Sequence, residues 1–94
     1  DQVDGFIIGP YDLSGSLGVP GQWEHPSVIE ALDKVNKVIS INEKPGGYHV
    51  VHTDHKELNR RIDEGYKFIA YLDDMVFFAE NIAKETNFIS ELRK

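Results

Sequence analysis

Val3-Asp4-Gly5-Phe6-Ile7-Ile8-Gly9-Pro10-Tyr11-Asp12-Leu13-Ser14 is the stretch that decides the fold of this 94-residue chain. Its apolar run, residues 5–8, shows no alternation, which is typical of a strand buried on both faces of a parallel sheet. The run ends at Gly9-Pro10, and the carboxylate of Asp12 follows two residues later. Parallel α/β proteins place their chemistry at the carboxyl ends of such strands. We therefore expect Asp12 to lie at the functional edge of a sheet, where a carboxylate suits a hard metal ion.

The next segments alternate between helix and strand patterns. Residues 11–25 contain four Gly or Pro residues, which predict a long loop of a kind that is often functional. Pro26 suits the first turn of a helix, and the apolar spacing that follows predicts an amphipathic helix up to residue 41, ended by residues 42–45. Residues 48–51 are predicted as a second short strand.

The last third of the chain repeats the alternation. Asp54 followed by Glu57 matches a capping box, and Gly65 is a usual stop, so a helix is predicted between them. Residues 66–72 are predicted as a third strand. Asp73 or Asp74 can cap a final helix, which we expect to pack through four apolar side chains. These are Phe78, Ile82, Ile89 and Leu92.

The order strand, helix, strand, helix, strand, helix predicts an α/β fold with a parallel sheet and right-handed crossovers. Three strands alone would leave two open parallel edges. A TIM barrel has eight βα units and a usual length of about 250 residues. If this chain is three of these units, the neighbouring strands of the barrel would cover its two open edges. We therefore treat residues 1–94 as a single segment of such a barrel, and the start at Asp1 suggests a piece of something longer.

Composition narrows the class of protein. The net charge of −6 and the lack of a basic stripe argue against a nucleic-acid partner. No apolar segment is long enough to span a membrane, and no signal peptide is visible. The chain contains no cysteine, which excludes disulfides and thiolate chemistry and is compatible with the cytoplasm.

The opening stretch, continued by Leu17-Gly18-Val19-Pro20-Gly21-Gln22 and His25-Pro26, strongly resembles the HpcH/HpaI aldolase and citrate lyase family. Its pattern G-P-x-D-L-S followed by L-G-x-P-G is specific and is nearly complete here. The stretches Lys44-Pro45-Gly46-Gly47 and residues 64–69 fit the entries to the family's last two strands more loosely. The resemblance covers essentially the whole chain and implies the C-terminal three βα units of the family's TIM barrel.

This resemblance implies a metal-dependent class II pyruvate aldolase, a carbon–carbon lyase that cleaves a 4-hydroxy-2-oxo acid to pyruvate and an aldehyde. Asp12 would be one of two acidic ligands of magnesium, manganese or cobalt. The main chain at Gly9, Pro10, Tyr11 and Asp12 would hold the carboxylate of pyruvate. The other acidic ligand, the His base and an Arg lie upstream in the family, so no catalytic residue is assigned here and the isolated chain is expected to be inactive. A homo-oligomer is also implied, a hexamer in the family, in which the last helix packs on a neighbouring subunit.

Two departures from the family pattern concern the rim of the pocket. Leu72 and Asp73 stand where the family has small residues before the Asp that ends its last strand. Residues 49–52, which include His49 and His52, replace the usual apolar and small residues after the preceding strand. Both changes bear on the aldehyde specificity more than on the metal.

Other interpretations of these residues stay open. Asp12 alone would more often be a helix cap or turn residue, Ser14 a hydroxyl that satisfies local backbone, and Tyr11 a packing residue of the loop. His49, His52 and His55 form a spaced set, so a small histidine-based metal-binding protein is one alternative. A non-catalytic assembly module is another, and cleavage of an acyl-CoA thioester, as in citrate lyase, is a less favoured relative of the aldolase reaction.

Overall fold

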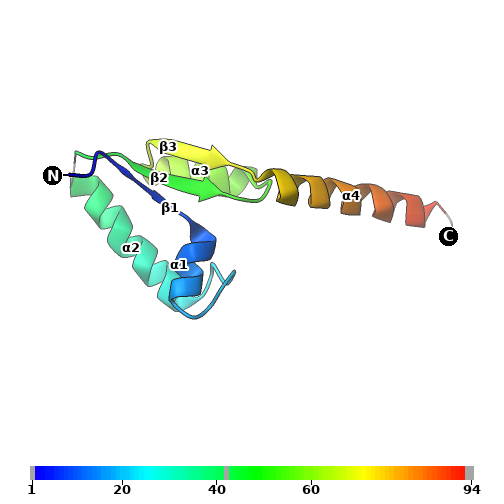
Figure 1. Cartoon of the computed structure of the whole chain (residues 1–94), viewed down its shortest axis with the longest axis horizontal. Helices are drawn as coiled ribbons and strands as arrows, with labels where there is room; N and C mark the ends of the chain where they lie inside the picture. Colours follow the sequence, from blue (N-terminus) through cyan, green and yellow to red (C-terminus); the bar gives the residue numbers. More distant parts are fainter. Residues whose placement is uncertain (1, 42, 93–94) are drawn as a thin grey trace.

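The computed structural model describes residues 2–41 and 43–92. Along the chain, the elements are β1 (Phe6–Ile8), α1 (Pro10–Ser16), α2 (Pro26–Ile41), β2 (Gly46–Val50), α3 (His55–Asp63), β3 (Phe68–Tyr71) and α4 (Asp74–Glu91). The strands form one parallel sheet in the order β1-β2-β3, which confirms the predicted α/β class (Figure 1). None of the helices in the described ranges combines the length and the apolar character needed to cross a membrane.

One face of the sheet forms the core with α2 and α3. Val28 and Leu32 of α2 pack with Tyr48 and Val50 of β2, and Tyr66 joins them from the turn after α3. Tyr48 and Val50 are two residues apart, so both side chains point to the same face. Burial raises the pKa values of Tyr48 and Tyr66 to about 12, so both hydroxyl groups stay neutral at physiological pH.

The opposite face of the sheet is open. Ile7 of β1 and Phe68 of β3 are apolar, yet they are 51% and 43% exposed. In a barrel closed by further strands, this is the kind of face that points inward and becomes covered. Within the described residues, α2 and α3 therefore cover one face of the three-stranded sheet and leave the other face uncovered.

Helix α1 corrects the prediction of an unbroken loop over residues 11–25. Pro10 occupies the first turn, where a missing N–H costs nothing. The buried Ser14 hydroxyl donates to the Pro10 carbonyl at 2.7 Å and accepts from the Gly21 amide at 3.0 Å. One side chain therefore holds both the short helix and the loop that follows it, and a count of Gly and Pro residues does not reveal such an anchor.

The predicted helix starts are largely confirmed. Asp54 accepts from the Glu57 amide at 3.0 Å, and Asp73, rather than Asp74, caps α4 by accepting from the Val76 amide at 3.1 Å. The reciprocal half of the capping box is not formed, because the Glu57 carboxylate receives a hydrogen bond from Arg61 instead. Gly65 follows α3 with a φ of +101°, a conformation that favours glycine. Asn42, part of the predicted helix end, lies outside the described residues.

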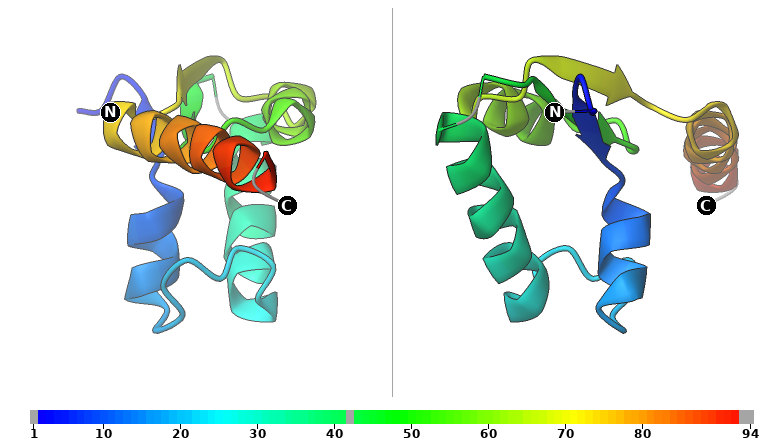
Figure 2. Two further views of the ribbon diagram at one scale, coloured as in Figure 1. Left: turned by 90° about the vertical axis from the view of Figure 1, so that its right-hand side faces the viewer. Right: turned by 60° about the vertical axis from the view of Figure 1, so that its left-hand side comes forward.

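Helix α4 does not pack on the rest of the described chain. Figures 1 and 2 show α4 projecting away from the sheet, and no residue of α4 is buried. Phe78, Ile82, Ile89 and Leu92 are all at least half exposed. The predicted apolar side chains are present on α4, but no part of the described chain covers them.

Candidate functional site

The end of β1 presents an unpaired carboxylate. Gly9 caps α1 with an extended backbone, and Asp12 lies in the first turn of that helix, with an exposed side chain. Among the residues that the structure describes, the Asp12 carboxylate has no hydrogen-bond or ion-pair partner. A Cβ atom at Gly9 would lie 3.2 Å from Asp12 Oδ2, so the glycine keeps the space beside the carboxylate open.

Two backbone donors accompany this carboxylate. The first backbone hydrogen bond of α1 runs from the Leu13 amide to the Gly9 carbonyl at 2.9 Å. Pro10 has no N–H, and the amides of Tyr11 and Asp12 precede that bond, so they have no acceptor within the helix. Fixed N–H donors beside a carboxylate can hold an anionic oxygen while the carboxylate faces a cation. The structure thus brings Gly9, Pro10, Tyr11 and Asp12 together at one end of β1.

The side chain of Tyr11 packs against the loop. Its hydroxyl group lies 3.0 Å from Nε2 of His52, and its ring meets Trp23 edge-on at 4.9 Å between centroids. His52 in turn lies with Nδ1 2.5 Å from Oε1 of Glu80 on α4. The Tyr11 contribution to the candidate site is therefore its amide. Ser14 serves the local backbone, as the alternative interpretation of this residue held.

The three histidines do not converge. His49 hydrogen-bonds to the carbonyl of Leu72, His52 lies between Tyr11 and Glu80, and His55 is exposed at the start of α3. Within residues 2–41 and 43–92, no three His, Asp or Glu side chains are grouped closely enough to hold a metal ion. The histidine-based metal site therefore has no support from this arrangement.

The structure places His49 on the open face of the sheet, which the sequence analysis did not predict. Tyr48 and Val50 are fully buried against the helices, whereas His49 between them is partly exposed. Alternation along a strand puts the imidazole on the open face of the sheet, near its carboxyl end. The pattern Tyr-His-Val shows that His49 faces the other way from its two neighbours. It identifies the face of His49 only when the buried face of the strand is known.

The donor set at Asp12 fits a divalent cation in part. Magnesium and manganese prefer oxygen ligands, and magnesium often binds through only one or two carboxylates. Asp12 supplies one unpaired carboxylate with open space beside it. Gly9, Pro10 and Tyr11 have no carboxylate, so a second acidic ligand would have to come from another part of the protein.

Comparisons with known proteins relate this arrangement to a family of enzymes, although no family model matches the chain. The chain is 40% identical over 75 residues to the hydroxypyruvate/pyruvate aldolase of Roseobacter denitrificans, an alignment that covers 80% of the chain and 28% of that enzyme. It is 38% identical over 77 residues to the pyruvate aldolase of Rhizobium etli, covering 82% of the chain and 30% of the relative. A 5-keto-4-deoxy-D-glucarate aldolase of Escherichia coli is 32% identical over 76 residues, with 81% and 29% covered.

Solved structures agree with the sequence relatives. The HpcH/HpaI aldolase from Desulfitobacterium hafniense matches with a TM-score of 0.80 and 30% identity, over 95% of this chain and 34% of that one. A HpcH/HpaI aldolase/citrate lyase family protein from Burkholderia cenocepacia matches with a TM-score of 0.76 and 25% identity, over 98% and 34%. The chain is therefore related, in sequence and in fold, to the HpcH/HpaI TIM-barrel aldolases, and it spans about one third of the length of the members it matches.

Proposed function

We propose that residues 1–94 form the C-terminal part of a divalent-metal-dependent pyruvate aldolase. The reaction is carbon–carbon bond cleavage of a 4-hydroxy-2-oxo acid to pyruvate and an aldehyde. The names of the relatives support the reaction class. The observation that carries the proposal to this chain is the unpaired Asp12 carboxylate beside two free backbone amides at the carboxyl end of β1.

Each group at this end of β1 has a distinct task. Asp12 holds the metal ion, which is magnesium, manganese or cobalt. The amides of Tyr11 and Asp12 bind the carboxylate of the oxo acid, and Gly9 and Pro10 place the backbone so that the ligand can approach it. When bound, the ion supplies a Lewis acid that neutralises negative charge on the oxo oxygen during cleavage. Asp12 and the amides therefore bind and orient one end of the substrate.

The chain on its own is expected to be inactive. It contributes one acidic ligand from this site, whereas the resemblance places the second ligand and the base upstream. The open sheet face with exposed Ile7 and Phe68 supports this view, because further strands would cover it. The active form is then the complete protein that carries these residues, which we propose to be a homo-oligomer.

The test is Mn²⁺ binding by the complete protein, together with pyruvate release from a 4-hydroxy-2-oxo acid. Asp12→Asn keeps the shape of the side chain but removes its charge, so we expect Mn²⁺ affinity to fall at least about 10-fold and turnover to be lost. Asp33→Asn is the matched control, because Asp33 is an exposed carboxylate on α2 away from β1. Equal Mn²⁺ affinity in Asp12→Asn and the wild type would contradict the role of Asp12.

A further inference from the structure

The register of the sheet places His49 beside the candidate site. Ile8 of β1 is paired with Tyr48, so Gly9 and His49, one residue further along each strand, lie at the same level. On its other side His49 is paired with Ala70 of β3. Side chains at one level of a parallel sheet point to the same face. The neighbours of the imidazole in this row are thus a glycine and an alanine, which leave space around it on the open face.

A hydrogen bond fixes the tautomer of the His49 ring. Nε2 lies 2.7 Å from the carbonyl oxygen of Leu72. A carbonyl oxygen only accepts, so Nε2 carries the hydrogen and Nδ1 of the neutral ring is an acceptor. Within the described residues, Nδ1 has no hydrogen-bond partner. The ring is therefore anchored at one nitrogen and offers an acceptor at the other.

The anchor itself is unusual. Leu72 has a φ of +73°, and its amide donates to the Val50 carbonyl at 2.8 Å. A bulky residue with positive φ is a conformational outlier of the kind that gathers at functional sites. The structure holds this strained residue where its carbonyl meets His49. This gives the imidazole a defined orientation at the carboxyl edge of the sheet.

We propose that Nδ1 of His49 accepts a hydrogen bond from the C4 hydroxyl group of the bound substrate before cleavage, an inference that rests on the proposed aldolase function. The single hydroxyl proton passes to the base, not to His49, when the carbon–carbon bond breaks. The carboxylate and the oxo group of a 4-hydroxy-2-oxo acid are acceptors only. The C4 hydroxyl is the donor shared by every substrate of this class, so an acceptor-only atom in the wall of the site is complementary to it. His49 is then a residue that recognises the aldehyde half, while Asp12 and the amides recognise the pyruvate half.

Two variants separate this contact from the anchoring bond to Leu72. His49→Gln keeps an N–H donor near the position of Nε2 and removes the acceptor at Nδ1. His49→Asn does the reverse, because its amide oxygen falls near Nδ1 but cannot reach Leu72. Oxaloacetate supplies the matched substrate: loss of carbon dioxide from it gives the same pyruvate half, and it has no hydroxyl group.

The experiment compares KM of the complete protein for a 4-hydroxy-2-oxo acid and for oxaloacetate, because a contact made before cleavage appears in KM. Loss of one hydrogen bond predicts that His49→Gln raises KM about 10-fold for the hydroxy acid and less than about 2-fold for oxaloacetate. His49→Asn is expected to raise KM for the hydroxy acid less than His49→Gln does. Equal rises in KM for both substrates, or no rise for either, would overturn the role of His49. A wild-type protein that converts neither substrate would instead overturn the proposed function.

Imidazole ¹⁵N chemical shifts provide a readout that does not depend on turnover. In the complete protein, His49 should show a protonated Nε2 and an unprotonated Nδ1. Addition of a 4-hydroxy-2-oxo acid should shift Nδ1, whereas pyruvate, which lacks the hydroxyl group, should leave it nearly unchanged. A His49 ring protonated at Nδ1, or one that responds equally to both compounds, contradicts the proposal.

Discussion

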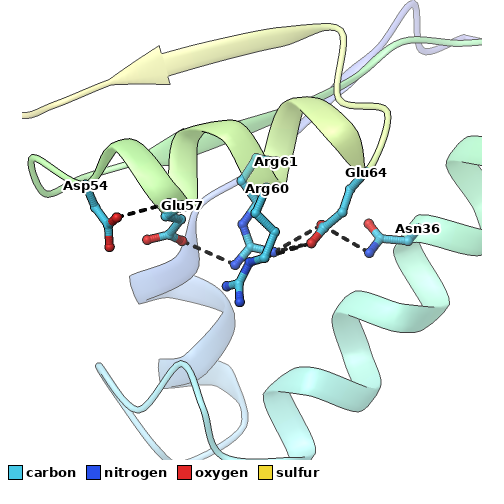
Figure 3. Close-up of polar contacts among 6 residues, drawn as sticks. All are labelled: Asn36, Asp54, Glu57, Arg60, Arg61 and Glu64. Atoms are coloured by element: carbon cyan, nitrogen blue, oxygen red, sulfur yellow. Dashed lines mark hydrogen bonds and ion pairs between the residues drawn. The ribbon is translucent and has the colours of Figure 1, made fainter.

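At the scale of single residues, Arg61 is a charged side chain that is buried in the described structure. It is only 3% exposed and donates to Glu57 and Glu64 at 3.1–3.2 Å (Figure 3). Its guanidinium carbon lies 4.2 Å from the centre of the Tyr48 ring. Burial works against its charge, yet its pKa is raised, because Tyr48 and the two carboxylates favour the charged form. Arg61 therefore links α3 to the centre of the sheet through both charge and packing.

Removal of this side chain should be costly. Arg61→Ala leaves the partly buried Glu57 carboxylate without its partner, removes two of the hydrogen bonds to Glu64 and uncovers Tyr48. We therefore expect a loss of about 3 kcal/mol in the free energy of unfolding. Urea unfolding followed by circular dichroism measures it. The control is Lys34→Ala, which breaks the Lys34–Glu30 pair, whose side chains are 74% and 71% exposed. That change should cost less than about 0.5 kcal/mol. Similar losses in the two variants would show that Arg61 has no special role.

At the scale of elements, close contact between α2 and the sheet depends on Gly46. A Cβ atom at this position would lie 2.8 Å from Cζ of Phe6 and 2.9 Å from Cδ1 of Ile39. The start of β2 is thus the point where a side chain of β1 and a side chain of α2 meet over bare backbone. The glycine is required for packing between elements, because Gly46 is not among the residues with positive φ.

Gly46→Ala should therefore lower the free energy of unfolding by about 1–3 kcal/mol, since Phe6 and Ile39 would have to move in a packed core. Gly15→Ala is the matched control. Gly15 lies within α1, and a Cβ atom there would meet nothing within 4 Å. Replacing a helical glycine by alanine should stabilise the protein by about 0.5–1 kcal/mol. The two Gly-to-Ala changes thus have opposite predicted signs in the same unfolding experiment, and equal signs would refute the packing argument.

At the scale of the whole molecule, the long dimension of 59 Å comes from α4, which continues beyond the sheet (Figure 1). Five of its exposed apolar residues follow spacings of three, four and seven, which put them on one face of the helix. These residues are Met75, Phe78, Ile82 and Ile89 of α4 and Leu92 at its C-cap. An apolar stripe of this length on a projecting helix indicates an interaction surface. We propose this stripe as the contact surface of the homo-oligomer inferred under the proposed function.

Ile82→Glu places a charge at the middle of this stripe, so we expect it to weaken self-association at least about 10-fold. Sedimentation velocity at several protein concentrations measures the effect. Asn87→Glu adds the same charge on the opposite side of α4 and should leave association unchanged. If both variants associate as the wild type does, the stripe of α4 is not the contact between copies.

Apart from α1, the sequence by itself determined the kinds of elements and their order. Apolar runs, capping residues such as Asp54 and Asp73, and the stop at Gly65 act within a few residues of one another, so local patterns are sufficient to predict them. The G-P-Y-D motif likewise placed Asp12 at the end of β1. Because Ser14 bonds to Gly21 seven residues away, helix α1 depends on a contact that no local pattern encodes.

Only the tertiary structure decided which side chains face which space. The register of β1, β2 and β3 sets His49 level with Gly9 and its ring against Leu72, 23 residues further along the chain. A shift by one residue would turn the imidazole to the opposite face. For α4, the apolar spacing shows which face of the helix is apolar, but it does not show what that face contacts. Contacts between distant segments depend on how whole elements pack, and they therefore required the folded chain.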